Sequence, residues 1–172
     1  MKNLILVLLI AVSAFQIVAQ PTENVLTPTQ FENIKINNAS LRQIWDSGGD
    51  VNQVKSLLGD NVTVTNQDPI PGALSRLFTY SDLELEFTNH IEATGNLGNF
   101  EITGPSVSIT VNGRTVKIGD HILKLGGTQK NNDTDGGKSI LFVPSNDETV
   151  CLYIDYNQST GIITKIGYFV LT

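Results

Sequence analysis

The sequence NNDTDGGK, which begins at Asn131, carries the residue types most suited to binding a metal ion. Asn131, Asp133 and Asp135 alternate along it and a glycine follows, as in the first half of an EF-hand calcium loop. The twelfth position of such a loop should be a bidentate glutamate, but here it is Phe142, and the flanking residues are typical of strands. We therefore reject an EF-hand and expect a polar loop without a metal. The alternative is a calcium loop of another kind at Asn131, Asp133 and Asp135.

Glu84 and Glu86 are paired carboxylates in the sequence LELEF, whose alternation predicts a half-buried strand. Residues i and i+2 of a strand lie on one face. Glycosidases use two carboxylates, but those flank a substrate cleft, whereas neighbouring acids on one strand more often face water. The matching sequence LYIDY places Tyr153 and Asp155 on the corresponding face. An acidic sheet face with aromatic residues is more typical of a binding surface than of a catalytic site.

Two further aromatic residues are candidates for binding. Trp45 is the only tryptophan and precedes the first expected helix, and Tyr80 lies in an expected turn. Tryptophan and tyrosine are favoured anchors in protein interfaces. In the alternative interpretation, Trp45 fills the gap between a helix and the sheet, and Tyr153 is exposed without a role in binding.

Other chemistries have no complete motif in the sequence. His90 and His121 have neither H-x-x-x-H spacing nor a cysteine at metal-binding spacing. Cys151 has no basic or histidine neighbour in the sequence to activate it, so we expect a buried, inert thiol. The nucleophile elbow G-x-S-x-G and the phosphate-binding loop G-x-x-x-x-G-K-[ST] are absent. We therefore expect no enzyme activity and no cofactor.

The first twenty residues predict the cellular location. A lysine at position 2, an apolar run from Leu4 to Ala14, and the small residue Ala19 near a cleavage point are typical of a secretory signal peptide. The apolar run is shorter than the roughly 20 residues that span a membrane, although a membrane anchor is the alternative. No cysteine lies near the cleavage point to carry a lipid. We expect a secreted or periplasmic bacterial protein without a membrane span.

The charge of the remaining chain excludes one class of partner. Without residues 1–20, the chain has 10 basic and 17 acidic residues, a formal charge of −7. Nucleic-acid binding depends on lysine and arginine residues that neutralise phosphates, so an acidic chain without a basic run is a poor candidate for it. A single cysteine cannot form an internal disulfide. The core must therefore be held by apolar burial, which is feasible for a domain of this length.

A nine-residue phrase occurs twice in the chain. IKINNASLR starts at Ile34 and ITVNGRTVK starts at Ile109. The strand-like sequences LELEF and NFEIT follow the first phrase, and LYIDY and GIITKIGYFV follow the second. We interpret this shared order as an internal duplication.

Local signals place the expected elements. Phe31 opens the first expected strand, in the sequence FENIKIN, and the pair Asn112–Gly113 predicts a hairpin turn. Asp50 caps an expected helix that Gly59 ends. Asp120 caps a shorter expected helix in the second half.

The predicted fold is therefore α+β, with two tandem copies of a small strand–helix–three-strand module, mostly antiparallel sheet, and short helices packed on one face. Each copy buries little surface alone, so the two are expected to form one compact unit. The expected organisation is a signal peptide at 1–20, a flexible N-terminal tail at 21–30, a first repeat at 31–103 and a second repeat at 106–171.

The doubled order resembles the β-lactamase inhibitory protein family and the related small envelope lipoproteins of the SmpA/OmlA kind. The likeness lies in VKSLLGD and KIGDHILKL as helix segments and in LELEF, LYIDY and ITKIGYFV as strands, and it spans most of residues 31–171. The chain departs from the family because it has no disulfide pair and no cysteine for lipid attachment. The resemblance implies tandem α+β modules and binding of a protein through a sheet surface, and it transfers no inhibitory residue.

These observations favour a non-enzymatic binding module that recognises a protein or a cell-envelope component through the outer face of its sheet. The alternatives are a structural or assembly protein of the bacterial envelope, and an enzyme with an Asp, Glu and Tyr site that has no recognisable motif. The candidate binding residues are Glu84, Glu86, Tyr153, Asp155, Tyr80 and Trp45.

Overall fold

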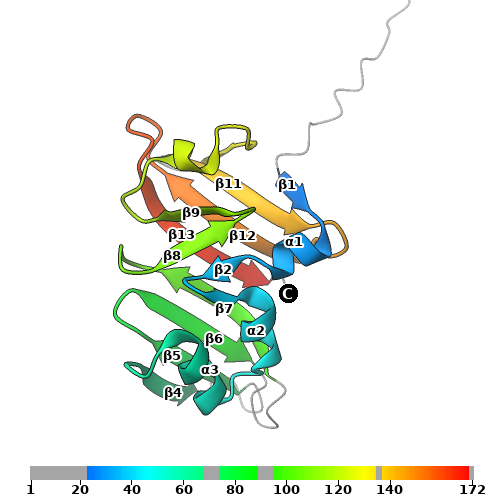
Figure 1. Ribbon diagram of the computed structural model, residues 1–172, viewed down its shortest axis with the longest axis vertical. Helices are drawn as coiled ribbons and strands as arrows, with labels where there is room; N and C mark the ends of the chain where they lie inside the picture. Colours follow the sequence, from blue (N-terminus) through cyan, green and yellow to red (C-terminus); the bar gives the residue numbers. More distant parts are fainter. Residues whose placement is uncertain (1–22, 68–73, 89–94, 135–136, 171–172) are drawn as a thin grey trace, which may run out of the picture.

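A nine-stranded sheet is the largest element of the protein (Figure 1). The computed structural model of the chain describes residues 23–67, 74–88, 95–134 and 137–170. The strand order is β1-β11-β12-β13-β7-β6-β5-β4, with β10 paired to β11. The pairing of β1 with β11 is parallel, and the other pairings in this sheet are antiparallel. The strands are β1 (Glu23–Leu26), β4 (Thr63–Gln67), β5 (Ser75–Thr79), β6 (Leu83–Thr88), β7 (Asn96–Ile102), β10 (Asn132–Thr134), β11 (Gly137–Pro144), β12 (Val150–Tyr156) and β13 (Ile163–Val170).

A second, four-stranded sheet has the order β3-β2-β8-β9. Its strands come from both copies of the nine-residue phrase, because each copy forms a hairpin, and β2 of the first pairs antiparallel with β8 of the second. The last two residues of the first copy, Leu41 and Arg42, instead begin a helix. Asn37 (φ 52°) and Asn112 (φ 51°) occupy the same position in the two turns, in a backbone conformation that asparagine tolerates. The strands are β2 (Lys35–Ile36), β3 (Ala39–Ser40), β8 (Ser108–Val111) and β9 (Arg114–Lys117).

The helices are short, and polar side chains begin them. Thr27 and Gln30 form a reciprocal capping box, and Ser40 and Gln43 form another. The carboxylate of Asp50 accepts hydrogen bonds from two backbone N–H groups of the next helix. These elements are α1 (Pro28–Glu32), α2 (Leu41–Asp46), α3 (Val51–Leu58) and the 3₁₀ helix η2 (Ile122–Leu125).

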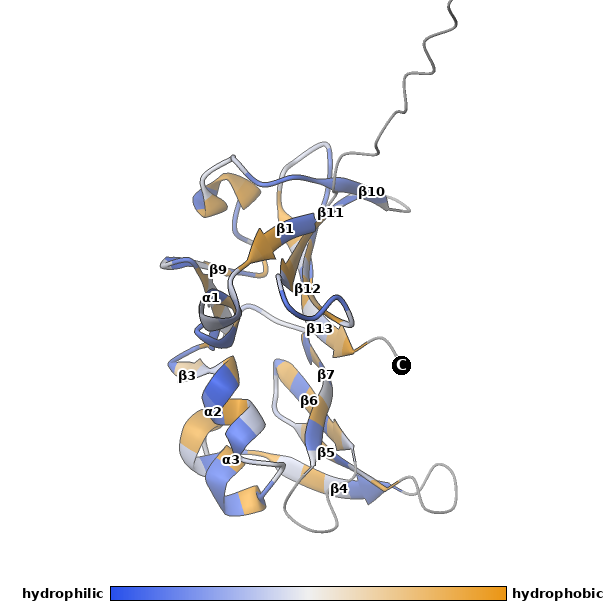
Figure 2. Ribbon diagram, turned by 90° about the vertical axis from the view of Figure 1, so that its right-hand side faces the viewer, coloured by the Kyte–Doolittle hydropathy of each residue, from blue (hydrophilic) through white to orange (hydrophobic). Residues whose placement is uncertain are grey.

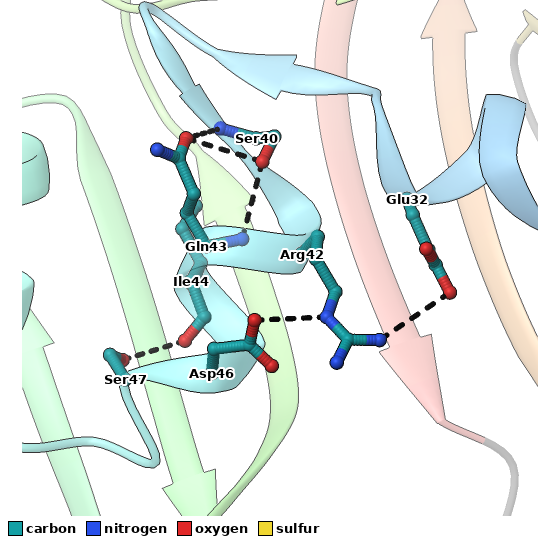
Figure 3. A network of polar contacts seen from close by, with 7 residues as sticks. All are labelled: Glu32, Ser40, Arg42, Gln43, Ile44, Asp46 and Ser47. Atoms are coloured by element: carbon teal, nitrogen blue, oxygen red, sulfur yellow. Dashed lines mark hydrogen bonds and ion pairs between the residues drawn. The ribbon is translucent and has the colours of Figure 1, made fainter.

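Polar contacts also join α1 to α2 and occur at the end of α2 (Figure 3). Arg42 Nε donates to Asp46 Oδ2 at 2.9 Å, and Arg42 Nη1 lies 3.7 Å from Glu32 Oε1. At the end of α2, the Ser47 hydroxyl donates to the Ile44 carbonyl at 2.6 Å. Because the Arg42 contacts are exposed, we expect them to add little to stability, whereas the buried Ser47 hydroxyl satisfies a helix-end carbonyl.

The four-stranded sheet and the helices lie on one side of the nine-stranded sheet (Figure 2). The core fills the space between them, since Leu85, Phe100 and Ile154 of the large sheet belong to the same buried cluster as Ile36 and Ile109 of the small sheet. No element of the described residues covers the opposite face of the nine-stranded sheet, which we call the outer face (Figure 2).

The predicted fold class is wrong. The protein is mostly strand, and it is built around a large mixed sheet rather than two α+β modules with helices packed on one face. Strand pairings cross the expected boundary between the copies, since β2 pairs with β8 and β7 pairs with β13. An unpaired strand edge leaves N–H and C=O groups without partners, and pairing β7 with β13 removes two such edges. The α-helices of the described residues also all precede residue 59.

Three local predictions are wrong as well. Described residues of the expected tail form β1 and α1, and Phe31 lies in α1 rather than in a strand because the Thr27 capping box begins a helix there. The segment after Asp120 forms only a 3₁₀ turn, and its cap is His121. Gly119 and Gly126 take positive φ values on either side of that turn, so the stretch is too short to nucleate an α-helix. Helix α2 was not expected, although Ser40 and Gln43 are a capping-box signal.

Other local predictions are confirmed. Helix α3 begins after Asp50 and ends at Gly59. The Asn112–Gly113 pair turns between β8 and β9 with both residues at positive φ. The sequences LELEF and LYIDY lie in β6 and β12 with the expected alternation of burial. The expected signal peptide, residues 1–20, lies outside the described residues.

Candidate functional site

Four predicted binding residues lie on the outer face. In β6, Glu84 is exposed and Glu86 is partly exposed, and they alternate with residues that are fully buried on the inner side. In β12, Tyr153 and Asp155 are half-buried and alternate in the same way. The period-two alternation of a strand places each pair on one side.

The strand register joins the two pairs into one surface. Glu84 of β6 is opposite Glu101 of β7, Glu101 is opposite Gly167 of β13, and Gly167 is opposite Tyr153 of β12. These four residues therefore form one row across four strands. With strands about 4.8 Å apart, the Cα atoms of Glu84 and Tyr153 are about 14 Å apart. The structure thus brings together residues that are far apart in the sequence.

Tyr153 lies at the end of this row and is its aromatic residue. Its ring lies over Gly167, where any Cβ atom would collide with it. The ring of Phe169 is 5.9 Å from it, centroid to centroid, at an angle of 41°. Lys165 Nζ lies 5.8 Å from the Tyr153 ring centroid and 2.8 Å from Glu101 Oε2. These neighbours hold the ring in one place on an open surface, as an interface anchor requires.

The ionisable groups beside Tyr153 influence one another. Burial raises the pKa of the Tyr153 phenol, and the positive charge of Lys165 opposes this rise. The hydrogen bond to Glu101 raises the pKa of Lys165. The lysine therefore stays charged and the phenol neutral at physiological pH, so the phenol does not act as a base.

Acidic residues share the outer face with Tyr153. Glu86 accepts a hydrogen bond from the Asn99 amide at 2.6 Å across the β6–β7 pair. Glu84 faces Glu101 across the same pair, and Asp155 faces Lys165. Neither Glu84 nor Glu86 lines the cavities described below, and paired carboxylates on an open strand do not provide the enclosed geometry of a glycosidase.

An apolar hollow of about 430 Å³ lies beside Tyr153 toward the β1 edge. Val25 is 59% exposed at its rim. Cys151 is buried in its floor, and that burial, reinforced by the charge of Glu23, raises the pKa of the thiol to about 11. The inert thiol expected from the sequence is consistent with this position. The hollow is lined by Glu23, Val25, Leu141, Val143, Pro144, Ser145, Glu148, Cys151 and Phe169.

Trp45 and Tyr80 do not join the outer face. Trp45 lies on α2, on the inner side of the sheet, with its ring 6.3 Å from that of Phe31. Tyr80 packs against the core just before β6, and its buried hydroxyl has no hydrogen-bond partner among the described residues. Burial, reinforced by the charge of Asp60, raises the pKa of Tyr80 to about 12.

Trp45 instead lines a cavity of about 370 Å³ between α1, α2 and the large sheet, which we call the inner cavity. The ring of Tyr168 is 6.4 Å from that of Trp45, at an angle of 49°. The buried indole Nε1–H of Trp45 has no hydrogen-bond partner among the described residues. The inner cavity is lined by Pro28, Glu32, Trp45, Asn96, Leu97, Pro144, Asn146, Asp147, Val150, Tyr168 and Val170.

Several of these residues were missed by sequence reasoning. Lys165, Gly167 and Phe169 alternate in the sequence GIITKIGYFV, and that alternation could have placed them beside Tyr153. Glu32 and Asp147 could not have been found in this way, because they lie far apart in the sequence and only the packing of α1 against the end of β11 brings them to one cavity.

The residues considered for a metal have protein partners. Asn131 Oδ1 accepts a hydrogen bond from the Tyr156 hydroxyl at 2.8 Å, and Asp133 forms an ion pair with Lys138 at 3.2 Å. Asp135 lies outside the described residues. His121 caps η2, its Nδ1 accepting from a backbone N–H, and His90 lies outside the described residues. The described part of the chain contains no group of three His, Cys, Asp or Glu side chains that could hold a metal ion.

Within the described residues, no helix has the length and apolar character needed to cross a membrane.

Comparisons with known proteins give little guidance. No protein-family model matches the chain, and no curated protein matches it. Among solved structures, a cysteine-rich secretory protein from Staphylococcus aureus is similar at a TM-score of 0.37 with 15% sequence identity. The similarity covers 74% of this chain and 45% of that chain, so the chain spans less than half the length of that protein. A likeness this weak carries no argument about fold or function.

Proposed function

We propose that the chain is a secreted or periplasmic, non-enzymatic binding module that contacts a protein or a cell-envelope component through its outer face. The observation that carries this proposal is the position of Tyr153, which is held over Gly167 and beside Phe169 on a sheet face that no described element covers. Aromatic residues held in place on an open surface are the usual energetic centres of protein interfaces.

The surroundings of Tyr153 support the same proposal. An apolar hollow lies on one side of it, and the acidic residues Glu84, Glu86 and Glu101 lie on the other. An apolar centre with a charged rim is the common anatomy of an interface. The acidic rim favours a partner with a basic surface, since complementary charge speeds association and excludes wrong partners.

The test is a comparative capture experiment. The chain from residue 23 onward is immobilised and exposed to culture and envelope fractions of its host at physiological salt. A double variant, Tyr153→Ala with Asp155→Lys, alters the outer face, and Asn38→Lys alters an exposed turn of the small sheet as the control. Retained proteins are identified by mass spectrometry, and their affinities are measured by surface plasmon resonance.

We expect a protein that the wild-type chain and the control variant retain but the outer-face variant does not. Loss of an anchor residue weakens binding by about 2 kcal/mol or more, or roughly 30-fold. The outer-face variant should remain folded at the temperature of the capture, because the buried residues on the inner side of β12 are unchanged, and a far-UV circular dichroism melting curve checks this. If the double variant retains the same proteins with the same affinity, the outer face is not the binding site.

A further inference from the structure

We propose that the inner cavity is a second binding site, independent of the outer face, which takes a small amphipathic cation: an apolar ring that carries a primary ammonium group. Nothing in the proposed outer-face function requires this cavity. It lies on the opposite side of the large sheet, among α1, α2 and the ends of β11 and β13.

The wall of the cavity is aromatic. Phe31 stacks on Trp45 at 6.3 Å and 22°, and Phe100 stacks on Tyr168 at 5.6 Å and 10°. Trp45 and Tyr168 both line the cavity, and Leu97 provides an apolar surface beside them. Aromatic faces attract cations, with tryptophan the strongest, and they also pack well against an apolar ring.

The charges that line the cavity are negative. Glu32 and Asp147 are its acidic residues, and none of the described residues that line it is a lysine or arginine. Hydrogen bonds from Thr149 lower the pKa of Asp147, so this carboxylate is ionised at neutral pH. Glu32 forms an ion pair at 3.7 Å with Arg42, which is exposed and lies closer to Asp46, at 2.9 Å. The cavity therefore complements a positive ligand.

The Tyr168 phenol does not add a further charge. Burial raises its pKa well above the usual range, the charge of Asp147 raises it further, and the nearby indole of Trp45 acts in the opposite direction. The indole N–H and the phenol nevertheless make no hydrogen bond of normal geometry, so the buried Trp45 Nε1–H has no hydrogen-bond partner among the residues that the structure describes. An ammonium group donates hydrogen bonds and cannot accept one, so this N–H is not a contact of the proposed ligand, which the aromatic faces and the carboxylates would hold instead.

The volume of the cavity, about 370 Å³, lies within the range of sites that bind small molecules. Together, the aromatic wall, the two carboxylates and the size favour a ring-bearing amine over an anion, a nucleotide or a sugar. We infer contacts of the ammonium group with Asp147 and of the ring with Trp45 and Tyr168.

Trp45 is the only tryptophan of the chain, so its fluorescence reports on this cavity directly. The probe is 2-phenylethylamine, titrated into the folded chain with excitation of the indole. The matched probe is 2-phenylethanol, which has the same ring but no charge. We expect a saturable change in Trp45 emission with the amine, and binding of the alcohol at least about 10-fold weaker because the ion pair is lost.

Two variants test the charge. Asp147→Asn should weaken binding of the amine about 10-fold and leave binding of the alcohol unchanged. Asp60→Asn makes the same chemical change at an exposed residue outside both proposed sites, and should leave both affinities unchanged. Far-UV circular dichroism melting curves establish that each variant is folded.

Three results would overturn the proposal. The first is the absence of a saturable change in Trp45 emission up to about 10 mM amine, a range that covers millimolar binding. The second is equal affinity for the amine and the alcohol, and the third is an Asp147→Asn variant that binds the amine as tightly as the wild type does. Because the outer-face double variant leaves the cavity intact, its behaviour in the capture experiment does not affect this result.

Discussion

Gly49 and Gly113 share a backbone φ of 75° but have different surroundings. A Cβ atom at Gly49 would lie 2.9 Å from the Cβ and Cγ atoms of buried Phe87, whereas at Gly113 it would meet nothing within 4 Å. The pair therefore separates two costs that usually occur together: the strain of a left-handed residue and the collision of a side chain with the core.

We predict that Gly113→Ala lowers the free energy of unfolding by about 1 kcal/mol, the cost of an L-residue in the left-handed region. Gly49→Ala should lower it by about 3 kcal/mol, because forcing an extra methyl group into a packed core adds about 1–3 kcal/mol. Urea denaturation of both variants measures the difference. Equal losses of unfolding free energy in the two variants would mean that Phe87 moves aside at no cost in free energy.

Tyr80 is the residue for which pH dependence gives the clearest test. Its pKa is raised from 10 to about 12, mainly by burial, so the folded chain holds the phenol proton more tightly than the unfolded chain does. The stability contributed by this group is therefore complete below pH 10 and is lost as the pH rises toward 12. Tyr153, Tyr168 and Cys151 also have raised pKa values. The loss of stability of the wild type at high pH is therefore shared between Tyr80 and these three groups.

We predict that Tyr80→Phe makes the fall in unfolding free energy between pH 10 and 12 less steep than in the wild type. At pH 7 the variant should be at least as stable as the wild type, because it removes a buried hydroxyl that has no hydrogen-bond partner in the described part of the chain. Urea denaturation at pH 7, 10 and 11.5 checks both statements. A loss of about 1 kcal/mol or more at pH 7 would show that the hydroxyl has a partner.

At the scale of elements, capping decides where the short helices begin. Helix α2 has only six residues, which is too few for stability from helix propensity alone. Ser40 accepts a hydrogen bond from the Gln43 N–H at 3.2 Å, and the Gln43 side chain accepts one from the Ser40 N–H at 2.9 Å (Figure 3). The inward residues Leu41 and Ile44 are fully buried, so the cap and the core act together.

We predict that Ser40→Ala lowers the free energy of unfolding by about 1 kcal/mol, the usual cost of losing an N-cap. Ser56→Ala, at an exposed position inside α3, makes the same chemical change without removing a cap, and it should be neutral or slightly stabilising because alanine favours helix. Thermal melts of the two variants check this. If both substitutions have the same effect, the Ser40 capping box does not stabilise the protein.

At the scale of the whole molecule, the two halves of the large sheet meet at β7 and β13. Phe100 of β7 is opposite Tyr168 of β13, and their rings stack on the inner face. The small sheet makes a second connection, since β2 pairs with β8. Because both pairings and one core join the halves, neither half can lose its structure without exposing apolar surface of the other.

We predict a single unfolding transition. Trp45 fluorescence reports on the first half and far-UV circular dichroism on the whole, and the two urea curves should coincide. Phe100→Ala should lower the free energy of unfolding by about 3–5 kcal/mol, as large-to-small changes of buried aromatic residues do, and the curves should remain coincident. Two separated transitions would indicate halves that fold independently.

Local patterns in the sequence determined which strand side chains face away from the core and where one turn and one helix begin. The alternation in LELEF and LYIDY placed Glu84, Glu86, Tyr153 and Asp155 on the side away from the core, because the side chains of a strand alternate whatever its partner is. The Asn112–Gly113 turn and the Asp50 cap were also readable, since each depends on residues only a few positions apart.

The tertiary structure alone decided which strands became neighbours. The pairing of β7 with β13 put Tyr153 in one row with Glu84, and the packing of α1 near the end of β11 brought Glu32 and Asp147 to one cavity with Trp45. Such contacts join residues far apart in the chain, and strand edges and apolar surfaces accept many partners. The choice among them depends on how the whole core closes, and no short stretch of sequence carries that information.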